Sequence, residues 1–350
     1  IGEIETTLNT LKTRPTLIIQ KIAKKTKKIA KLKVNVFKEI NASVMDYLCG
    51  GTEVEIIFGV DYTYSNGIPT DKTSLHYVGD GWKPTPYGNA IKSIGQILEV
   101  YDSDKKFPLY GFGGKLSDDN KTKDIFAVNG NEDDPYETGI NSVHQLYVDT
   151  LKHNSVVLGG KMDKTKFAPL IKKASDMAME SKNNAENKYY ILVIITDGLI
   201  DDMMATKKLI IEAANKPLPL SIIIIGVGKA DFKKMDELDG DTQPISVMTL
   251  KNGIIKAERD IVQFIAYREK KNHLDLASDV IKEIPSQMMS YYLETNIKPK
   301  PRIKKTNEFT NKHLLNTGDD EIKRIENIDY EEDPKKQQIY EEIDLPIGWR

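Results

Sequence analysis

Short apolar runs alternate with longer amphipathic stretches from about residue 52 to residue 293. The apolar runs predict strands at residues 54–60, 107–112, 190–196 and 220–227, and at least one further strand near 124–129. Between them, apolar residues recur at helical spacing and predict helices at residues 85–102, 139–152, 167–180 and 201–216. Strands that alternate with helices are typical of a mainly parallel sheet, so we expect a three-layer, doubly wound α/β domain over residues 52–293.

The two ends of the chain do not follow this pattern. Residues 15–22 and 31–37 favour strands but have no helical partners, so we expect residues 1–43 to be the end of another domain and a linker. From residue 298 to 350, Pro and Lys and then acidic residues dominate, which predicts a disordered tail. The chain begins at Ile1 without a secretion leader, and we expect a fragment or a shortened member of a longer protein.

Composition narrows the class of protein. The longest apolar runs, about eight to ten residues, are too short to span a membrane. Cys49 is the single cysteine, so no intramolecular disulfide can form, and we expect a cytoplasmic protein. The net charge of -2 and the lack of a basic and aromatic motif argue against a nucleic-acid partner. Residues 21–33 carry seven lysines and no acid, which indicates either a solvated face or attraction to anionic phospholipid.

Carboxylates and hydroxyls follow two of the predicted strands. Asp61, Thr63 and Ser65 occupy alternate positions after the first strand, Asp197 follows a later strand, and Thr165 begins the helix "TKFAPLI" that precedes this later strand. The carboxyl ends of parallel strands meet at one edge of a sheet, so we expect these side chains to converge there, with Asp61 facing solvent. They are all hard oxygen ligands, which suit Mg²⁺, Mn²⁺ or Ca²⁺ and argue against zinc.

Other interpretations of these residues stay open. Each hydroxyl or carboxylate taken singly could cap a helix or a loop. An aspartyl-nucleophile phosphatase also begins with a strand that ends in Asp, but its usual second acid is Thr63 here. A metal-assisted phosphohydrolase lacks an evident general base or nucleophile, so we do not expect an enzyme. The five histidines are scattered, and ordinary surface or hydrogen-bonded positions account for them.

The residues also resemble a known family. Asp-x-Thr-x-Ser after a strand, a distant Thr and a later Asp are similar to the metal-ion-dependent adhesion site of von Willebrand factor A domains. The sequence around them resembles that of the copines over about residues 47–293, in "YLCGGTEVEIIFGVDYTYSNG", "SLHY", "YDSDKKFPLYGFGGKL", "NGNEDDPYETGI", "LVIITDG", "GVGKADFKKMDELDGD" and "RDIVQFIAYR". The resemblance implies that Asp61, Thr63, Ser65, Thr165 and Asp197 hold Mg²⁺ or Mn²⁺ and leave one position open for a carboxylate from a partner.

The resemblance implies further domains, and this sequence departs from the family's pattern at one place. Copines are calcium-dependent phospholipid-binding proteins with two C2 domains before the A-type domain, and "IGEIETTL" resembles the strand that follows the last calcium-binding loop of the second C2 domain. The Ca²⁺ ligands of the C2 domains would then lie before Ile1. The family's short "GPT" turn is replaced here by the longer segment "GGKMDKT". This departure concerns the assignment of Thr165, the last residue of the segment, as a metal ligand.

The resemblance also suggests where the protein acts and with what. We expect it to be recruited to the plasma membrane, where its partners are anionic phospholipid and intracellular proteins that offer an acidic residue. A calcium-independent membrane adaptor that uses the lysine run is the alternative.

Overall fold

The computed structural model describes residues 16–21, 27–33, 42–78, 85–241, 243–249, 253–270 and 273–301. The chain divides into two compact units, Ile1–Ser43 and Val44–Arg350. In the first unit, β1 (Thr16–Lys21) pairs antiparallel with β2 (Lys27–Lys33). The assignment of residues 1–43 to a C2 domain stays a prediction. Most of the predicted tail, residues 302–350, lies outside the described residues.

The second unit is built on one sheet, whose strands lie in the order β13, β10, β9, β3, β4 and β6, with β7 beside β4. Their bounds are β3 Glu53–Asp61, β4 Lys106–Phe112, β6 Phe126–Ala127, β7 Tyr136–Thr138, β9 Lys188–Thr196, β10 Leu220–Gly226 and β13 Val262–Ala266. The five strands from β13 to β4 are parallel, and β6 and β7 pair antiparallel with β4. The predicted α/β fold with a mainly parallel sheet is confirmed.

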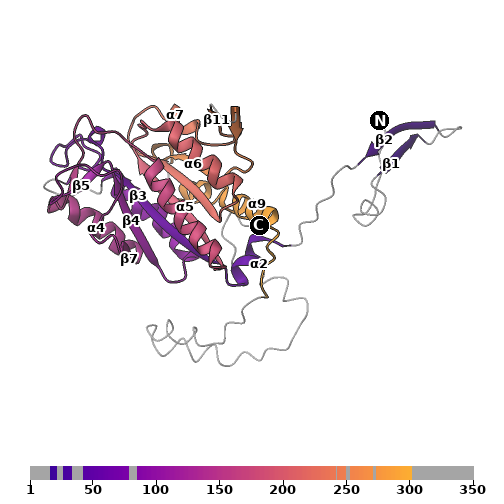
Figure 1. Cartoon of the computed structure of the whole chain (residues 1–350), viewed down its shortest axis with the longest axis horizontal. Helices are drawn as coiled ribbons and strands as arrows, with labels where there is room; N and C mark the ends of the chain where they lie inside the picture. Colours follow the sequence, from indigo (N-terminus) through magenta and orange to yellow (C-terminus); the bar gives the residue numbers. More distant parts are fainter. Residues whose placement is uncertain are drawn as a thin grey trace, which may run out of the picture. The chain divides into compact units, whose positions relative to one another are not determined.

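Helices cover both faces of this sheet (Figure 1). Four of them match the predicted helices: α3 Pro86–Leu98, α4 Ile140–Lys152, α5 Ala168–Asn183 and α6 Met203–Asn215. The remaining helices are α2 Val44–Cys49, α7 Lys233–Asp236, α8 His273–Val280 and α9 Ile284–Thr295. Two short strand pairs stand apart from the main sheet, β5 (Gly114–Leu116) with β8 (Val156–Leu158), and β11 (Ser246–Thr249) with β12 (Gly253–Lys256).

The buried strand β9 shows how the core is divided between the two faces. Tyr190, Leu192 and Ile194 belong to a cluster with the buried residues of α5 and α6. Tyr189, which alternates with them, contacts the rings of Tyr291 and Tyr292 on α9. Both faces of β9 are therefore covered, which explains its nearly continuous apolar sequence. None of the helices in the described parts of the chain has the length and apolarity that a membrane crossing requires.

The chain reverses its direction of travel across the sheet between β3 and β9. From β3 it crosses to β4 on one side, and from β9 it crosses to β10 on the other, while β3 and β9 are themselves neighbours. The loops that follow these two strands diverge, and the crevice between them is where α/β sheets bind ligands. The fold therefore places a candidate site at the ends of β3 and β9.

Candidate metal centre

The two predicted carboxylates lie at the ends of adjacent strands. Asp61 is the last residue of β3, and Asp197 follows Thr196, the last residue of β9. The register pairs Val60 with Ile195, so both strands end at the same level. We call this edge of the sheet, with the loops of residues 61–68, 156–165 and 197–204, the metal edge.

Asp61 is fully buried, so the expectation that it faces solvent is wrong. Its Oδ1 accepts hydrogen bonds from the backbone N–H of Thr63 at 2.9 Å and from the Thr63 hydroxyl at 2.6 Å. Its Oδ2 accepts a hydrogen bond from the Thr196 hydroxyl at 2.7 Å. The chain folds back over the strand end after Asp61, and these donors occupy the space that solvent would fill.

Thr63 and Ser65 extend this arrangement outward. Thr63 is buried and Ser65 is exposed, and their hydroxyl oxygens are 3.1 Å apart. Since the Thr63 proton is donated to Asp61, Ser65 must donate to Thr63 in this pair. The three residues of the Asp-x-Thr-x-Ser motif are thus linked in one hydrogen-bonded row that runs from the core to the surface.

The carboxylates of Asp61 and Asp197 affect each other electrostatically. Burial, and then the charge of Asp197, raise the pKa of Asp61 to about 7, against the opposing effect of its hydrogen bonds from Thr63 and Thr196. Asp197 is 5% exposed, and its Oδ1 accepts a hydrogen bond from Leu199 N–H at 3.0 Å. Neither carboxylate forms an ion pair with a Lys, Arg or His among the described residues.

His76 supports the strand end without adding charge to it. One ring nitrogen, Nε2, lies 2.9 Å from the backbone carbonyl of Asp61, and Nδ1 lies 2.9 Å from the Tyr147 hydroxyl. A carbonyl can only accept, so Nε2 carries the proton and Nδ1 accepts from Tyr147. Burial lowers the pKa of His76 to about 4, so the ring is neutral near pH 7. The sequence indicated an ordinary hydrogen-bonded histidine, and its place beneath the site was missed.

Thr165 is fastened to the loop that follows β9. Its backbone N–H donates to the Asp201 carboxylate at 2.9 Å, and its carbonyl accepts from Asp201 N–H at 2.9 Å. The next acid, Asp202, accepts hydrogen bonds from Phe167 N–H and Ala168 N–H at the start of α5. Thr165 therefore lies at the metal edge despite the longer preceding segment "GGKMDKT". Asp201 and Asp202 were missed, because helix-starting acids are common and carry no metal signal.

The donors that meet at the metal edge fit a hard divalent cation. Thr63 is hydrogen-bonded to both Asp61 and Ser65, Asp197 is close enough to act electrostatically on Asp61, and Thr165 is hydrogen-bonded to the loop that follows Asp197. All five predicted residues supply oxygen, as Mg²⁺ and Mn²⁺ prefer. A cation here would also balance two carboxylates that form no ion pair with any cationic side chain in the described part of the chain.

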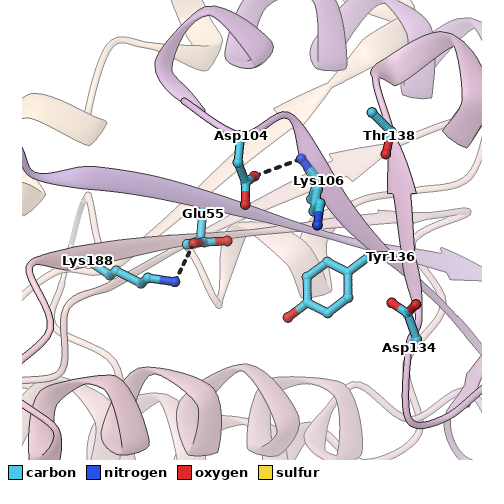
Figure 2. A pocket seen from close by; sticks show the side chains of 7 residues that line it. All are labelled: Glu55, Asp104, Lys106, Asp134, Tyr136, Thr138 and Lys188. Atoms are coloured by element: carbon cyan, nitrogen blue, oxygen red, sulfur yellow. Dashed lines mark hydrogen bonds and ion pairs between the residues drawn. The ribbon is translucent and has the colours of Figure 1, made fainter.

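A second cavity, of about 440 Å³, lies at the opposite edge, where β3, β4 and β9 begin (Figure 2). The Lys188 ammonium is 2.8 Å from the Glu55 carboxylate, and Asp104 accepts a hydrogen bond from Lys106 N–H at 2.9 Å. Three carboxylates share this cavity with two lysines. The two lysines bring positive charge into this cavity, which the metal edge does not have among the described residues, so we do not assign it to a metal.

Comparison with known proteins identifies one family. A family model described as Copine matches residues 74–300. Among solved structures, the manganese-loaded Plasmodium vivax TRAP protein is 12% identical with a TM-score of 0.38, over 62% of this chain and 70% of that one. Proximal thread matrix protein 1 from the mussel byssus is 17% identical with a TM-score of 0.35, over 65% of this chain and 48% of that one. A form of that mussel protein with a zinc-occupied MIDAS motif has a TM-score of 0.33 and 16% identity. At these scores, the structural similarities carry no inference about this site.

Proposed function

The chain belongs to the copine family, and from this premise we propose that its second unit binds one divalent cation, Mg²⁺ or Mn²⁺, at the metal edge. Asp61, Thr63, Ser65, Thr165 and Asp197 would hold the cation. The observation that carries the proposal is the juxtaposition of two buried carboxylates, Asp61 and Asp197, with no ion-pairing side chain among the described residues. A bound cation removes their repulsion, which burial otherwise makes costly.

We propose further that the cation recruits a partner protein through an acidic side chain. The five residues leave part of a six-oxygen coordination shell to water, and a partner carboxylate can replace that water. Ser65 is exposed at the outer end of the hydrogen-bonded row, so the cation would be reachable from solvent on that side. The site then binds and does not catalyse, since its carboxylates are committed to the cation and His76 is committed to Asp61 and Tyr147.

In the whole protein, we propose that calcium-dependent binding to anionic phospholipid brings this domain from the cytoplasm to the plasma membrane. Family membership supports this role, and C2 domains would carry it. The alternative is a calcium-independent adaptor that uses the lysines of residues 21–33. Sedimentation of this chain with phosphatidylserine vesicles tests the adaptor alternative, because adaptor binding would survive chelator and be lost at high salt.

The cation site is tested by thermal unfolding in EDTA, Mg²⁺, Mn²⁺ and Ca²⁺. A ligand that binds only the folded state stabilises it by about 2.7 kcal/mol at 100 times its dissociation constant. We expect Mg²⁺ or Mn²⁺ to raise the Tm of the wild type and to leave the Tm of Asp61→Asn unchanged. A Tm that no ion raises at millimolar concentration contradicts the proposal.

Asp71 provides a matched control for Asp61. Its Oδ1 also accepts hydrogen bonds from the N–H and hydroxyl of a residue two positions on, Thr73, at 2.8 and 2.9 Å, but Asp71 is exposed. Asp71→Asn should therefore keep the full metal-induced rise in Tm.

The acidic-partner role is tested with labelled Gly-Ser peptides that carry one Glu or one Gln. Binding that needs both Glu and the metal supports it, and equal binding of the two peptides contradicts it. Hydrolysis of p-nitrophenyl phosphate that disappears in Asp61→Asn would contradict the non-catalytic role.

A further inference from the structure

Large apolar side chains are exposed mainly around the metal edge. In the described part of the chain, eleven large hydrophobic residues are exposed. Six of them lie within the three segments that form this edge. The six are Tyr64, Ile68, Val157, Met162, Leu199 and Met204. Apolar side chains that gather on one surface, rimmed by polar ones, mark binding sites in soluble proteins.

Some of these side chains form a groove of about 280 Å³ beside the proposed cation. Tyr64, Ile68 and Pro69 line one part, and residues 156–161 line another. The two parts are fixed to each other, because Gly159 N–H donates to the Tyr62 carbonyl at 3.0 Å. Tyr64 lies between Thr63 and Ser65, two of the proposed ligands, so the loop that carries these ligands also lines the groove.

A positive charge lines the groove as well. Lys161 is exposed and forms no ion pair with any residue that the structure describes. The nearby acid, Asp163, has its carboxylate engaged by the Thr122 hydroxyl and by Gly160 N–H. An apolar groove that holds an unpaired lysine and adjoins a divalent cation is complementary to a segment with acids on either side of an apolar residue.

We propose that this groove receives a large apolar side chain of the partner segment whose acidic residue binds the cation, and that Lys161 receives a second acid beyond it. This inference rests on the proposed function. The occupant is an extended peptide with an acid, an apolar residue and a second acid at every second position. These three side chains face the protein together, since alternate side chains of an extended chain point the same way. The cation then selects partner segments that carry an acid. Among these segments, the groove selects those with a large apolar residue two positions from the acid.

The test measures fluorescence polarisation with the full chain in saturating Mg²⁺ or Mn²⁺. The probe is a labelled ten-residue peptide of Gly and Ser that carries Glu, Leu and Glu at alternate positions. Its matched peptides replace the Leu by Ser or the second Glu by Gln. We expect the loss of Leu to weaken binding about tenfold or more, as burial of a large aliphatic side chain predicts.

Substitutions in the groove should remove the preference for the Leu peptide and leave cation binding unchanged. Ile68→Ser and Val157→Ser should reduce the difference between the Leu and Ser peptides to less than about threefold, because each removes apolar lining. Both residues are exposed, so the metal-induced rise in Tm should persist. Lys161→Gln should reduce the preference for the second Glu. Ile254→Ser is the matched control, since Ile254 is 59% exposed and Ile68 is 55% exposed, and Ile254 lies on β12 away from the groove; it should change nothing.

Three results would overturn the groove proposal while leaving the cation site intact. They are equal binding of the Leu and Ser peptides, a Leu preference that survives in Ile68→Ser, and no binding of any peptide although the metal raises the Tm. Failure of every ion to raise the Tm is a different result, and it rejects the proposed function itself.

Discussion

Carboxylates also gather at a second place, on the side of the molecule where β13 begins. Asp239, Asp241, Asp260 and Glu283 each offer an oxygen, and these oxygens lie within 4.8 Å of one another. Burial, and then the charges of the neighbouring acids, raise the pKa of Glu283 to about 7 and that of Asp239 to about 6. These four side chains therefore repel one another when ionised, and the folded state holds protons that an unfolded chain would release.

This repulsion predicts the pH dependence of stability. The folded pKa of Glu283 is raised above its unfolded value, so between about pH 4.5 and pH 7 the folded state binds more protons and stability falls as pH rises. Glu283→Gln should reduce the fall in Tm between pH 5 and pH 8, measured by circular dichroism in the presence of EDTA. Glu53→Gln changes an exposed acid and should leave the fall unchanged. An unaltered fall in Glu283→Gln would show that another group causes it.

At the scale of single residues, the sequence located the candidate ligands but not their surroundings. Asp61 and Asp197 could be predicted because each directly follows a long apolar run. The burial of Asp61 could not be predicted, because its partner Thr196 is 135 residues away. Neither segment alone determines the register in which the two strands pair. His76 looked ordinary for the same reason, since its two partners come from β3 and α4.

Helix α5 lies close to the sheet because one strand residue has no side chain. Gly59 is on β3, and a Cβ there would lie 2.2 Å from Leu170 Cδ2 on α5. Leu170 is fully buried among packed neighbours, so it has little room to move. The glycine thus sets how closely the helix approaches β3, whose end carries Asp61.

Gly59→Ala should destabilise the protein by about 1 to 3 kcal/mol, as overpacking of a core does. The usual effect of replacing a strand glycine by alanine is stabilising, so the sign is diagnostic. Urea unfolding gives the free energy, and Leu170→Ala is the second variant of a double-mutant cycle. The cost of Gly59→Ala should be smaller in the Leu170→Ala background, because the methyl group then has space. A stabilising Gly59→Ala would mean that the helix can move away freely.

At the scale of elements, long periodic segments were predicted well and short ones were not. The strands β3, β4, β9 and β10 and the helices α3 to α6 match their predictions within a few residues. The predicted strand near 124–129 is reduced to Phe126–Ala127, and β13 was not predicted. In β13, Gln263 interrupts a five-residue run, and so short a run does not distinguish a strand from a buried helix turn.

The first and last described helices of the second unit, α2 and α9, meet at the edge opposite the metal edge. The rings of Tyr47 on α2 and Tyr292 on α9 are stacked with centroids 3.7 Å apart, and Figure 1 shows the two helices together. The Tyr47 hydroxyl donates to the Ile297 carbonyl at 2.9 Å. These contacts join segments about 250 positions apart, so their formation carries a large loop-closure entropy cost.

Tyr47→Ala should lower the stability of the unit by about 3 kcal/mol, as loss of a buried aromatic side chain does. Tyr47→Phe should lower it by about 1 kcal/mol, through the lost hydrogen bond alone. Both values come from urea unfolding in EDTA. The rise in Tm with Mg²⁺ or Mn²⁺ should be the same in both variants as in the wild type, because the metal edge is remote. A smaller rise in Tyr47→Ala would reveal coupling between the two edges.

The position of these ends has a mechanical consequence. The described part of the unit begins with α2 and ends after α9, both at the edge where β3 begins, while a partner would be held at the edge where β3 ends. Tension between the partner and the rest of the chain would run along β3, whose hydrogen bonds to β4 and β9 lie across that direction. Such bonds are loaded in shear and must yield together, not one after another as in peeling. If the domain binds a partner at the metal edge as proposed, this arrangement would resist a pull on that partner.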